Sequence, residues 1–225
     1  MRDLRYGLRT LGRNPGFAAV AALSLALGIG ANTAIFSLMD AVLLKMLPVK
    51  NPEQLVFLER GGGPPSPKRS SNLSYAFFEQ LRAQNEALVG ACAFVGSSLN
   101  VVVDGQAEFA QGGRVSGSFF TVLGVNALLG RTISEEDDKV PGAHPVVVIS
   151  HHYWRQRFAR DPAIVGKSVA LYGHPFTIIG VTPPDFFGVT VGDSPDFWAP
   201  EMMIAQFYPG ASIDWYFNHS LEFVL

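Results

Sequence analysis

The residues that come nearest to known chemical machinery are Gly166, Lys167 and Ser168, which match the end of a phosphate-binding loop. In such a loop, backbone N–H groups surround the phosphates and the lysine neutralises their charge. The motif also requires a glycine five residues before Gly166, and this chain has Asp161 there. The run after Ser168 predicts a strand, whereas a phosphate-binding loop opens a helix. We therefore predict no nucleotide binding at this position.

Three other features suggest metal binding or catalysis, and each has a simpler explanation. His151 and His152 are adjacent, so on a helix they point about 100° apart and cannot hold one metal together. The acidic run at residues 135–138 lacks the spaced oxygens and the glycine of a calcium loop, and we expect a solvated loop. Cys92 lies in an apolar run that predicts core packing, and as the single cysteine it excludes an intrachain disulfide. We predict no catalytic residue, no cofactor and no metal site.

The element that organises the chain is an uncharged stretch at residues 14–39, which lies between Arg13 and Asp40. As a helix it is about 39 Å long, whereas the hydrocarbon core of a bilayer is about 30 Å thick. We therefore predict a transmembrane helix within residues 14–44. Two alternatives are a buried helix of a soluble protein and a signal peptide cleaved near Ala31 or Ala34.

The flank of this helix predicts its orientation. Four basic residues precede it, Arg2, Arg5, Arg9 and Arg13, so the positive-inside rule places the N-terminus in the cytoplasm. Residues 1–13 also have the pattern of an amphipathic helix, with arginines on one face and leucines on another. This helix is either a docking surface for a cytoplasmic partner or a plain membrane anchor.

Small residues recur at every fourth position of the predicted membrane helix: Ala18, Ala22, Ala26, Gly30 and Ala34. Such a stripe lets a second helix approach closely in lipid. Apolar helices are also rich in alanine for other reasons, so two interpretations stay open, a helix-packing face and simple composition.

The rest of the chain, residues 48–225, predicts one large domain or two small lobes, with a boundary near residue 116. Strands and short helices follow one another without regular βαβ alternation, which favours an α+β fold. We expect strands at residues 54–59, 99–103, 106–115, 145–149, 167–171 and 175–181, helices at 75–84 and 151–159, and a helical turn at 119–124. Residues 182–200 look irregular. A net charge of −2 with dispersed basic residues argues against nucleic-acid binding.

Several stretches together resemble the MacB-like periplasmic core found in permease subunits of ABC transporters, especially the large duplicated permeases. They are the arginine-rich start with residues 26–44, then VSGSFFTVLGVNALLGR at 115–131, VVVISHHYWRQRF at 146–158, residues 161–186, and FWAP at 197–200. The resemblance implies porter-like α/β and mixed α+β lobes after a first membrane helix, with three further membrane helices beyond.

What the resemblance implies about function is export or efflux driven by a separate cytoplasmic ATPase, whose motion the periplasmic domain transmits. Implied partners are that ATPase, other permease helices or a second permease copy, and the lipids of a bacterial inner membrane. The chain lacks the three later helices, so we expect it to be the N-terminal part of a longer protein. The alternative is a single-pass, membrane-anchored periplasmic binding or scaffold protein without transport activity.

Overall fold

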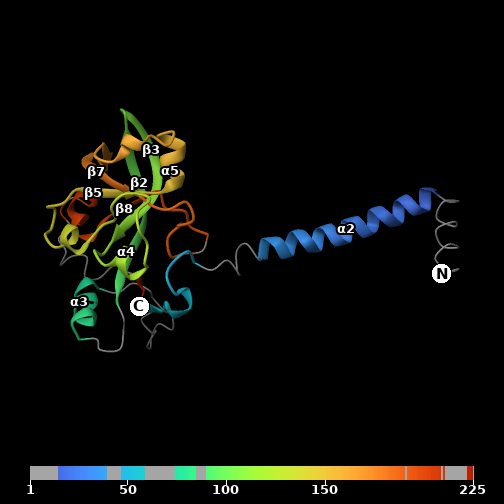
Figure 1. Cartoon of the computed structure of the whole chain (residues 1–225), viewed down its shortest axis with the longest axis horizontal. Coiled ribbons are helices and arrows are strands. Elements are labelled where there is room, and N and C mark those ends of the chain that lie inside the picture. Colours follow the sequence, from blue (N-terminus) through green and yellow to red (C-terminus); the bar gives the residue numbers. More distant parts are fainter. Residues whose placement is uncertain are drawn as a thin grey trace. The chain divides into compact units, whose positions relative to one another are not determined.

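The computed structural model describes residues 15–39, 47–58, 74–84, 90–190, 192–208, 210 and 222–224. The chain divides into two compact units, Met1–Met46 and Leu47–Leu225, and each is described by itself (Figure 1). The predicted cytoplasmic helix at residues 1–13, with Arg2, Arg5, Arg9 and Arg13, lies outside the described residues.

In the first unit, α2 (Pro15–Met39) is a continuous helix of 25 residues. Proline suits its first position, because the N–H that proline lacks has no partner in a first helical turn. Residues 15–37 are long and apolar enough to cross a membrane, and none of their side chains is buried. The hydroxyl of Thr33 donates to the carbonyl oxygen of Ile29 at 2.8 Å, so this polar group is satisfied within the helix. A helix is therefore present over these residues, and its place in a membrane stays a prediction.

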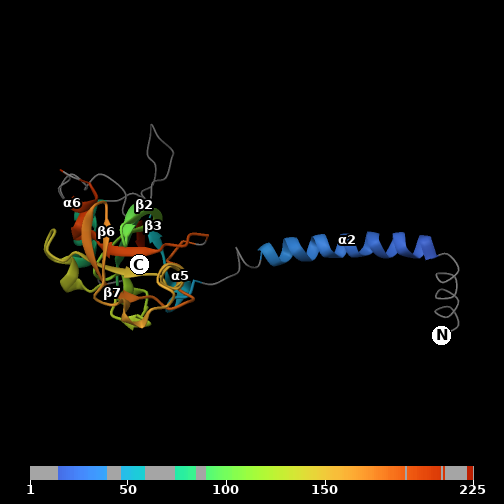
Figure 2. The same cartoon turned by 90° about the horizontal axis from the view of Figure 1, so that it is seen from above.

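The second unit is built on a mixed sheet of nine strands, in the order β1-β9-β2-β3-β8-β5-β7-β4, with β6 pairing both β2 and β7. The pairings of β2, β3, β8, β5, β7 and β6 therefore close into a ring (Figure 1 and Figure 2). The strands are β1 (Phe57–Leu58), β2 (Cys92–Val103), β3 (Gln106–Val115), β4 (Leu129–Gly130), β5 (Val146–Ile149), β6 (Ser168–Leu171), β7 (His174–Val181), β8 (Phe197–Pro200) and β9 (Glu222–Val224). Parallel pairs β3/β8 and β5/β7 occur beside antiparallel ones, which confirms a mixed α+β fold.

Short helices connect and cover these strands. They are α3 (Tyr75–Gln84), α4 (Phe119–Val122), α5 (His151–Arg157) and α6 (Ile204–Phe207), with 3-10 turns η2 (Pro52–Gln54), η3 (Glu135–Asp138), η4 (Pro162–Ile164) and η5 (Glu201–Met203). Two of the predicted helices begin at a serine whose hydroxyl caps the first turn. The hydroxyl of Ser74 accepts from the N–H of Phe77 at 3.3 Å, and that of Ser150 accepts from Tyr153 at 3.0 Å.

The predicted strands at 99–103 and 106–115, and those at 167–171 and 175–181, pair as two hairpins with tight turns. Asp104 and Gly105 have φ of 52° and 78°, and Tyr172 and Gly173 have 49° and 82°, which is the left-handed pair of a type I′ turn. Strand β2 starts seven residues earlier than expected. The sequence gives little sign of the earlier start, because Gly-Ser-Ser at residues 96–98 has low strand propensity. Even so, every residue of β3 pairs with a residue of β2.

Three apolar clusters fill the domain. The first contains inward-facing residues of the ring, among them Leu99, Ile149, Phe176, Ile178 and Phe197. The second packs Phe119 and Phe120 of α4 against Trp198, and the third packs α3 against the η5–α6 segment. Cys92 is buried in the second cluster, so its predicted place in the core is confirmed.

The structure corrects several boundaries. Helix α5 ends at Arg157, not at residue 159, because Ala159 and Arg160 adopt left-handed φ angles of 48° and 62°. The strand expected at 54–59 is confined to Phe57–Leu58 within the described residues. The supposedly irregular residues 182–200 end in β8, which is buried because β3 and β5 pair with it on both sides. The lobe boundary near residue 116 stays a prediction.

Candidate functional site

The small residues of the membrane helix lie on a surface without neighbours among the described residues. Ala22, Ala26, Gly30 and Ala34 are exposed, and a Cβ added at Gly30 would meet nothing within 4 Å. Residues four apart on a straight helix are offset by about 40°, so the stripe turns slowly around α2. Its packing role stays a prediction.

The lysine of the partial phosphate-loop motif already forms an ion pair with a carboxylate of the domain. The ammonium of Lys167 lies 2.5 Å from a carboxylate oxygen of Asp161, the residue that stands where the motif needs glycine. Asp161 also accepts from the N–H of Ala163 at 2.9 Å. Strand β6 begins at Ser168, so the predicted strand after Lys167 is confirmed and no helix N-terminus faces this point.

The adjacent histidines point to different surroundings. His151 packs its ring edge-on against Trp154, with 5.7 Å between ring centres, while His152 is exposed. Burial and the nearby Arg160 and Arg155 lower the pKa of His151. Among the described residues, no group of three or more His, Cys, Asp or Glu side chains is placed to hold a metal ion.

The acidic run at residues 135–138 is not a solvated loop throughout, and here the sequence prediction was wrong. Glu135 and Glu136 are exposed, but Asp137 and Asp138 are buried. Their burial follows from what they bind, since each carboxylate accepts hydrogen bonds from neighbouring segments and these replace water.

Asp137 anchors its own loop. Its carboxylate faces the guanidinium of Arg131 through two contacts, at 2.5 and 2.8 Å, and accepts from the N–H and the hydroxyl of Ser134. Burial alone would raise the pKa of Asp137, but the hydrogen bonds from Arg131 and Ser134 outweigh it and hold the pKa below its usual value.

Asp138 joins two segments that are distant in sequence. One carboxylate oxygen accepts from the N–H of Gly117, just after β3, at 3.0 Å. The other accepts from the N–H of Met202 in η5 at 2.8 Å. A Cβ at Gly117 would lie 2.6 Å from the Cα of Glu135, so only glycine allows the loop to pack this closely.

Beside Asp138 lies a buried ion pair that the sequence did not reveal. Arg114, at the end of β3, is fully buried, and its Nε lies 3.4 Å from a carboxylate oxygen of Glu201. Its guanidinium also lies over the rings of Phe207 and Tyr208, 5.3 Å from each ring centre. The sequence offered one indication of this ion pair, a charged residue near the end of the predicted strand at 106–115. An arginine at such a position must be either paired or solvated.

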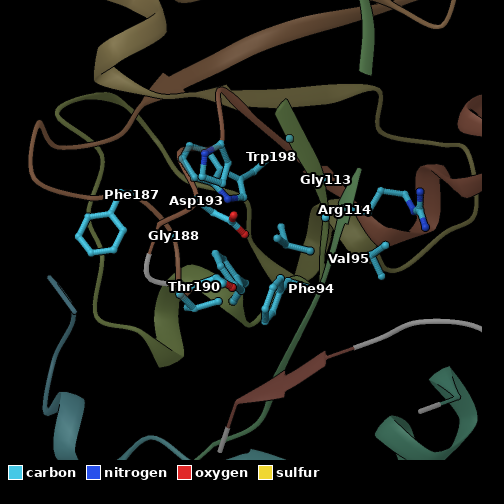
Figure 3. Close-up of a pocket in the computed structure, with 15 residues that line it drawn as sticks. Phe94, Val95, Gly113, Arg114, Phe187, Gly188, Thr190, Asp193 and Trp198 are labelled. Atoms are coloured by element: carbon cyan, nitrogen blue, oxygen red, sulfur yellow. The ribbon is translucent and has the colours of Figure 1, made fainter. Parts of the chain in front are cut away.

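A pocket beside β3 is too small for a substrate. Its lining includes Phe94, Phe119, Trp198 and Asp193, and also Arg114, whose side chain extends away from Asp193 (Figure 3). Its cavity volume is about 40 Å³, room for one or two water molecules. Ligand pockets are roughly 300–1,000 Å³. In the part of the domain that the structure describes, the charged side chains named above are thus paired with neighbouring groups of the domain itself.

Comparisons with solved structures place this fold among transporter domains. The periplasmic region of MacB from Actinobacillus actinomycetemcomitans is 21% identical and has a TM-score of 0.57, with 76% of this chain and 73% of that chain covered. The extracellular domain of the noncanonic ABC-type transporter YknZ from Gram-positive bacteria is 13% identical with a TM-score of 0.55, covering 76% and 82%.

A domain of a putative permease protein from Porphyromonas gingivalis is also similar, at 12% identity and a TM-score of 0.54, covering 78% of this chain and 76% of that one. At these identities the likeness shows the fold alone. A comparison with curated proteins finds no match. Residues 18–221 match the family described as the MacB-like periplasmic core domain. The chain therefore belongs to the MacB-like periplasmic core domain family.

Proposed function

We propose that this chain is the N-terminal part of an ABC transporter permease subunit, in which α2 anchors an extracytoplasmic domain in a bacterial inner membrane. A separate cytoplasmic ATPase supplies the motion, and the domain transmits it to the export of a substrate whose chemistry the chain does not reveal. The observation that carries the proposal is the family match over residues 18–221, which spans α2 and the domain together.

The interior of the domain supports a mechanical role. A body that transmits motion must keep its shape under load, and the ring supports this because each of its strands pairs with a strand on both sides over at least part of its length. The buried ion pair of Arg114 with Glu201, and the pair of the buried Asp137 with the half-exposed Arg131, further connect the segments between strands. The 40 Å³ pocket offers no room for a transported substrate inside the domain.

The helix α2 supports membrane attachment, and its surface supports a partner within the membrane. The small residues Ala22, Ala26 and Gly30 leave the helix backbone accessible, which suits close packing against another permease helix or a second copy of the subunit. The four arginines before α2 favour a cytoplasmic N-terminus, where the ATPase would be.

The proposal is tested first by topology. Alkaline phosphatase, which is active only outside the cytoplasm, is fused after Leu47 in one strain and after Arg13 in another. We expect activity from the first fusion alone. Activity from the Arg13 fusion alone would contradict the proposal.

The same strains distinguish a retained anchor from a cleaved signal peptide. N-terminal sequencing of the Leu47 fusion should give the intact start of the chain in the membrane fraction. A mature N-terminus near Ala31 or Ala34, with the fusion released from the membrane, would contradict membrane anchoring and with it the permease proposal.

A further inference from the structure

Two buried carboxylates meet where three segments of the domain are held together. Asp138 is 6% exposed and Glu201 is 1% exposed. Asp138 binds the N–H of Met202, the residue that follows Glu201, and also the N–H of Gly117. The loop at η3, the turn after β3 and the η5–α6 segment therefore depend on one carboxylate.

The charges of the buried groups do not balance, because two carboxylates, Asp138 and Glu201, lie near one arginine. One buried cation, Arg114, faces Glu201, and its guanidinium is shared with the rings of Phe207 and Tyr208. Within the described residues, the two hydrogen bonds that Asp138 accepts come from backbone amides, which are neutral donors. Two ionised carboxylates beside one guanidinium leave an excess negative charge in a site with little water, and this is costly.

The neighbouring elements add more negative than positive influence. On α3, the buried Tyr75 lies within the electrostatic influence of Asp138 and Glu201, and it also responds to Glu79 and to Arg82, whose guanidinium binds Glu135 at 2.8 Å. Glu135 lies in the same turn as Asp138 and acts on it as a second negative charge.

The other charged groups of the loop are engaged elsewhere. Asp137 binds Arg131, with His144 3.8 Å away, and Glu136 binds Lys139 at the surface. Within the described residues, Arg114 is thus the one cation in direct contact with either buried carboxylate.

We propose that Asp138 and Glu201 form a proton-binding pair, and that loss of the shared proton loosens the attachment of residues 201–207 to the turn at 116–118. The proton comes from solvent and returns to it, so no other reactant is needed. The inference does not depend on the transport role, because it concerns the stability of the domain itself.

The titration behaviour of the two groups agrees with this arrangement. Burial raises the pKa of Asp138 to about 7; the charges of Glu201 and Glu135 add to this, and the amide hydrogen bonds oppose it. Burial likewise raises the pKa of Glu201 to about 7, opposed by Arg114. Because the charge of Glu201 contributes to the raised pKa of Asp138, the two carboxyls titrate as an interacting pair.

The direction of the pH effect follows by linkage. In the unfolded chain these carboxyls ionise near their ordinary pKa values of 3.8 and 4.5, whereas the folded domain keeps the proton until about pH 7. Protonation therefore stabilises the closed arrangement most at low pH. That stabilisation is lost as the pH rises from about 4 through about 7, and it does not change further above about 8.

The test combines infrared spectroscopy with hydrogen exchange on the full chain in lipid nanodiscs. Between pH 6 and 8, the wild type should lose a C=O band of protonated carboxylic acid. Glu201→Gln and Asp138→Asn should each alter or remove that change. Glu136→Gln, an exposed carboxylate of the same turn, is the matched control and should keep the wild-type band.

Hydrogen exchange then measures the attachment. After correction for the intrinsic pH dependence of exchange, protection of residues 201–208 should fall by up to about tenfold per pH unit between pH 5.5 and 7, and level off by pH 8.5. Strand β5 should keep its protection. Glu201→Gln, which preserves side-chain shape, should flatten the dependence.

Two results would overturn the proposal. Absence of the protonated-acid band in the wild type would show that the pair holds no proton. Loss of the band without a change in exchange would show that the proton does not control the attachment. Because both are wild-type measurements, they decide the question even if a variant fails to fold.

Discussion

A single methyl group at Gly113 should separate two central strands of the domain. Gly113 pairs with Gly96 of β2 on one side and with Trp198 of β8 on the other. A Cβ built at Gly113 would lie 1.9 Å from the carbonyl oxygen of Val95, and real Cβ contacts are essentially never shorter than 3.0 Å. In Gly113→Ala, β2 and β3 must therefore move apart by about 1 Å at this point, a shift that the close packing of the interior resists.

The size of the effect follows from that displacement. The obstacle is backbone, which cannot rotate away as a side chain would, so we expect the upper part of the overpacking range, about 3 kcal/mol of lost stability. At about 2–4 °C per kcal/mol for a domain of this size, the melting temperature should fall by about 6–12 °C. Thermal unfolding of the full chain in detergent, followed by tryptophan fluorescence, measures this because Trp198 lies directly opposite Gly113.

The matched control is Gly96→Ala, in the paired position of β2. A Cβ there would meet nothing within 4 Å, so the variant should stay within about 0.5 kcal/mol of the wild type. Equal melting temperatures for the two variants would refute the register of β2 against β3 and the close approach at Val95.

Three further changes test separate parts of the account. Lys167→Ala should leave ATP binding undetectable by equilibrium dialysis with Mg²⁺, as in the wild type, and saturable micromolar binding lost in the variant would contradict this. Gly30→Leu should weaken cysteine crosslinking between membrane helices at equal expression, whereas Leu27→Phe should not. Equal crosslinking in the two variants would mean that the small residues reflect alanine-rich composition and do not form a helix-packing face. Arg131→Met should cost about 1 kcal/mol in urea unfolding at pH 7, where Asp137 is ionised, because the half-exposed arginine is screened by water. The depressed pKa of Asp137 stabilises the fold above its ordinary value of 3.8, and this effect is lost as the pH falls through the lowered pKa. The difference between wild type and variant should therefore shrink on acidification below pH 3.8, and a constant difference would contradict the pairing.

Local patterns predicted most of the fold. The uncharged span at α2, the Asp-Gly and Tyr-Gly turns, and the serines that begin α3 and α5 each act through neighbours within a few residues. Such features can be recognised in one sequence because their physical cause is local.

The buried charge cluster was missed for the opposite reason. Asp138 is 64 residues from Met202 and Arg114 is far from Glu201, so their contacts exist only after the ring of strands has closed. Sequence alone presents Asp137 and Asp138 as members of a polar run, and such runs are usually solvated. Similarly, the pairing of β3 to β8 across 80 residues of chain buries residues 197–200, which alone look like a proline-rich loop.

The central claim, a permease subunit that works with a separate ATPase, is tested most directly by its partners in the membrane. The native full-length protein is purified after crosslinking in host membranes. As a control, the same protein is prepared with residues 1–39 replaced by an unrelated single-pass anchor of the same orientation. We predict that the native protein alone recovers, in fixed stoichiometry, a subunit with a phosphate-binding loop and vanadate-sensitive ATP hydrolysis. Recovery of the same partners by both proteins without ATP hydrolysis would contradict the transporter account and favour a membrane-anchored scaffold.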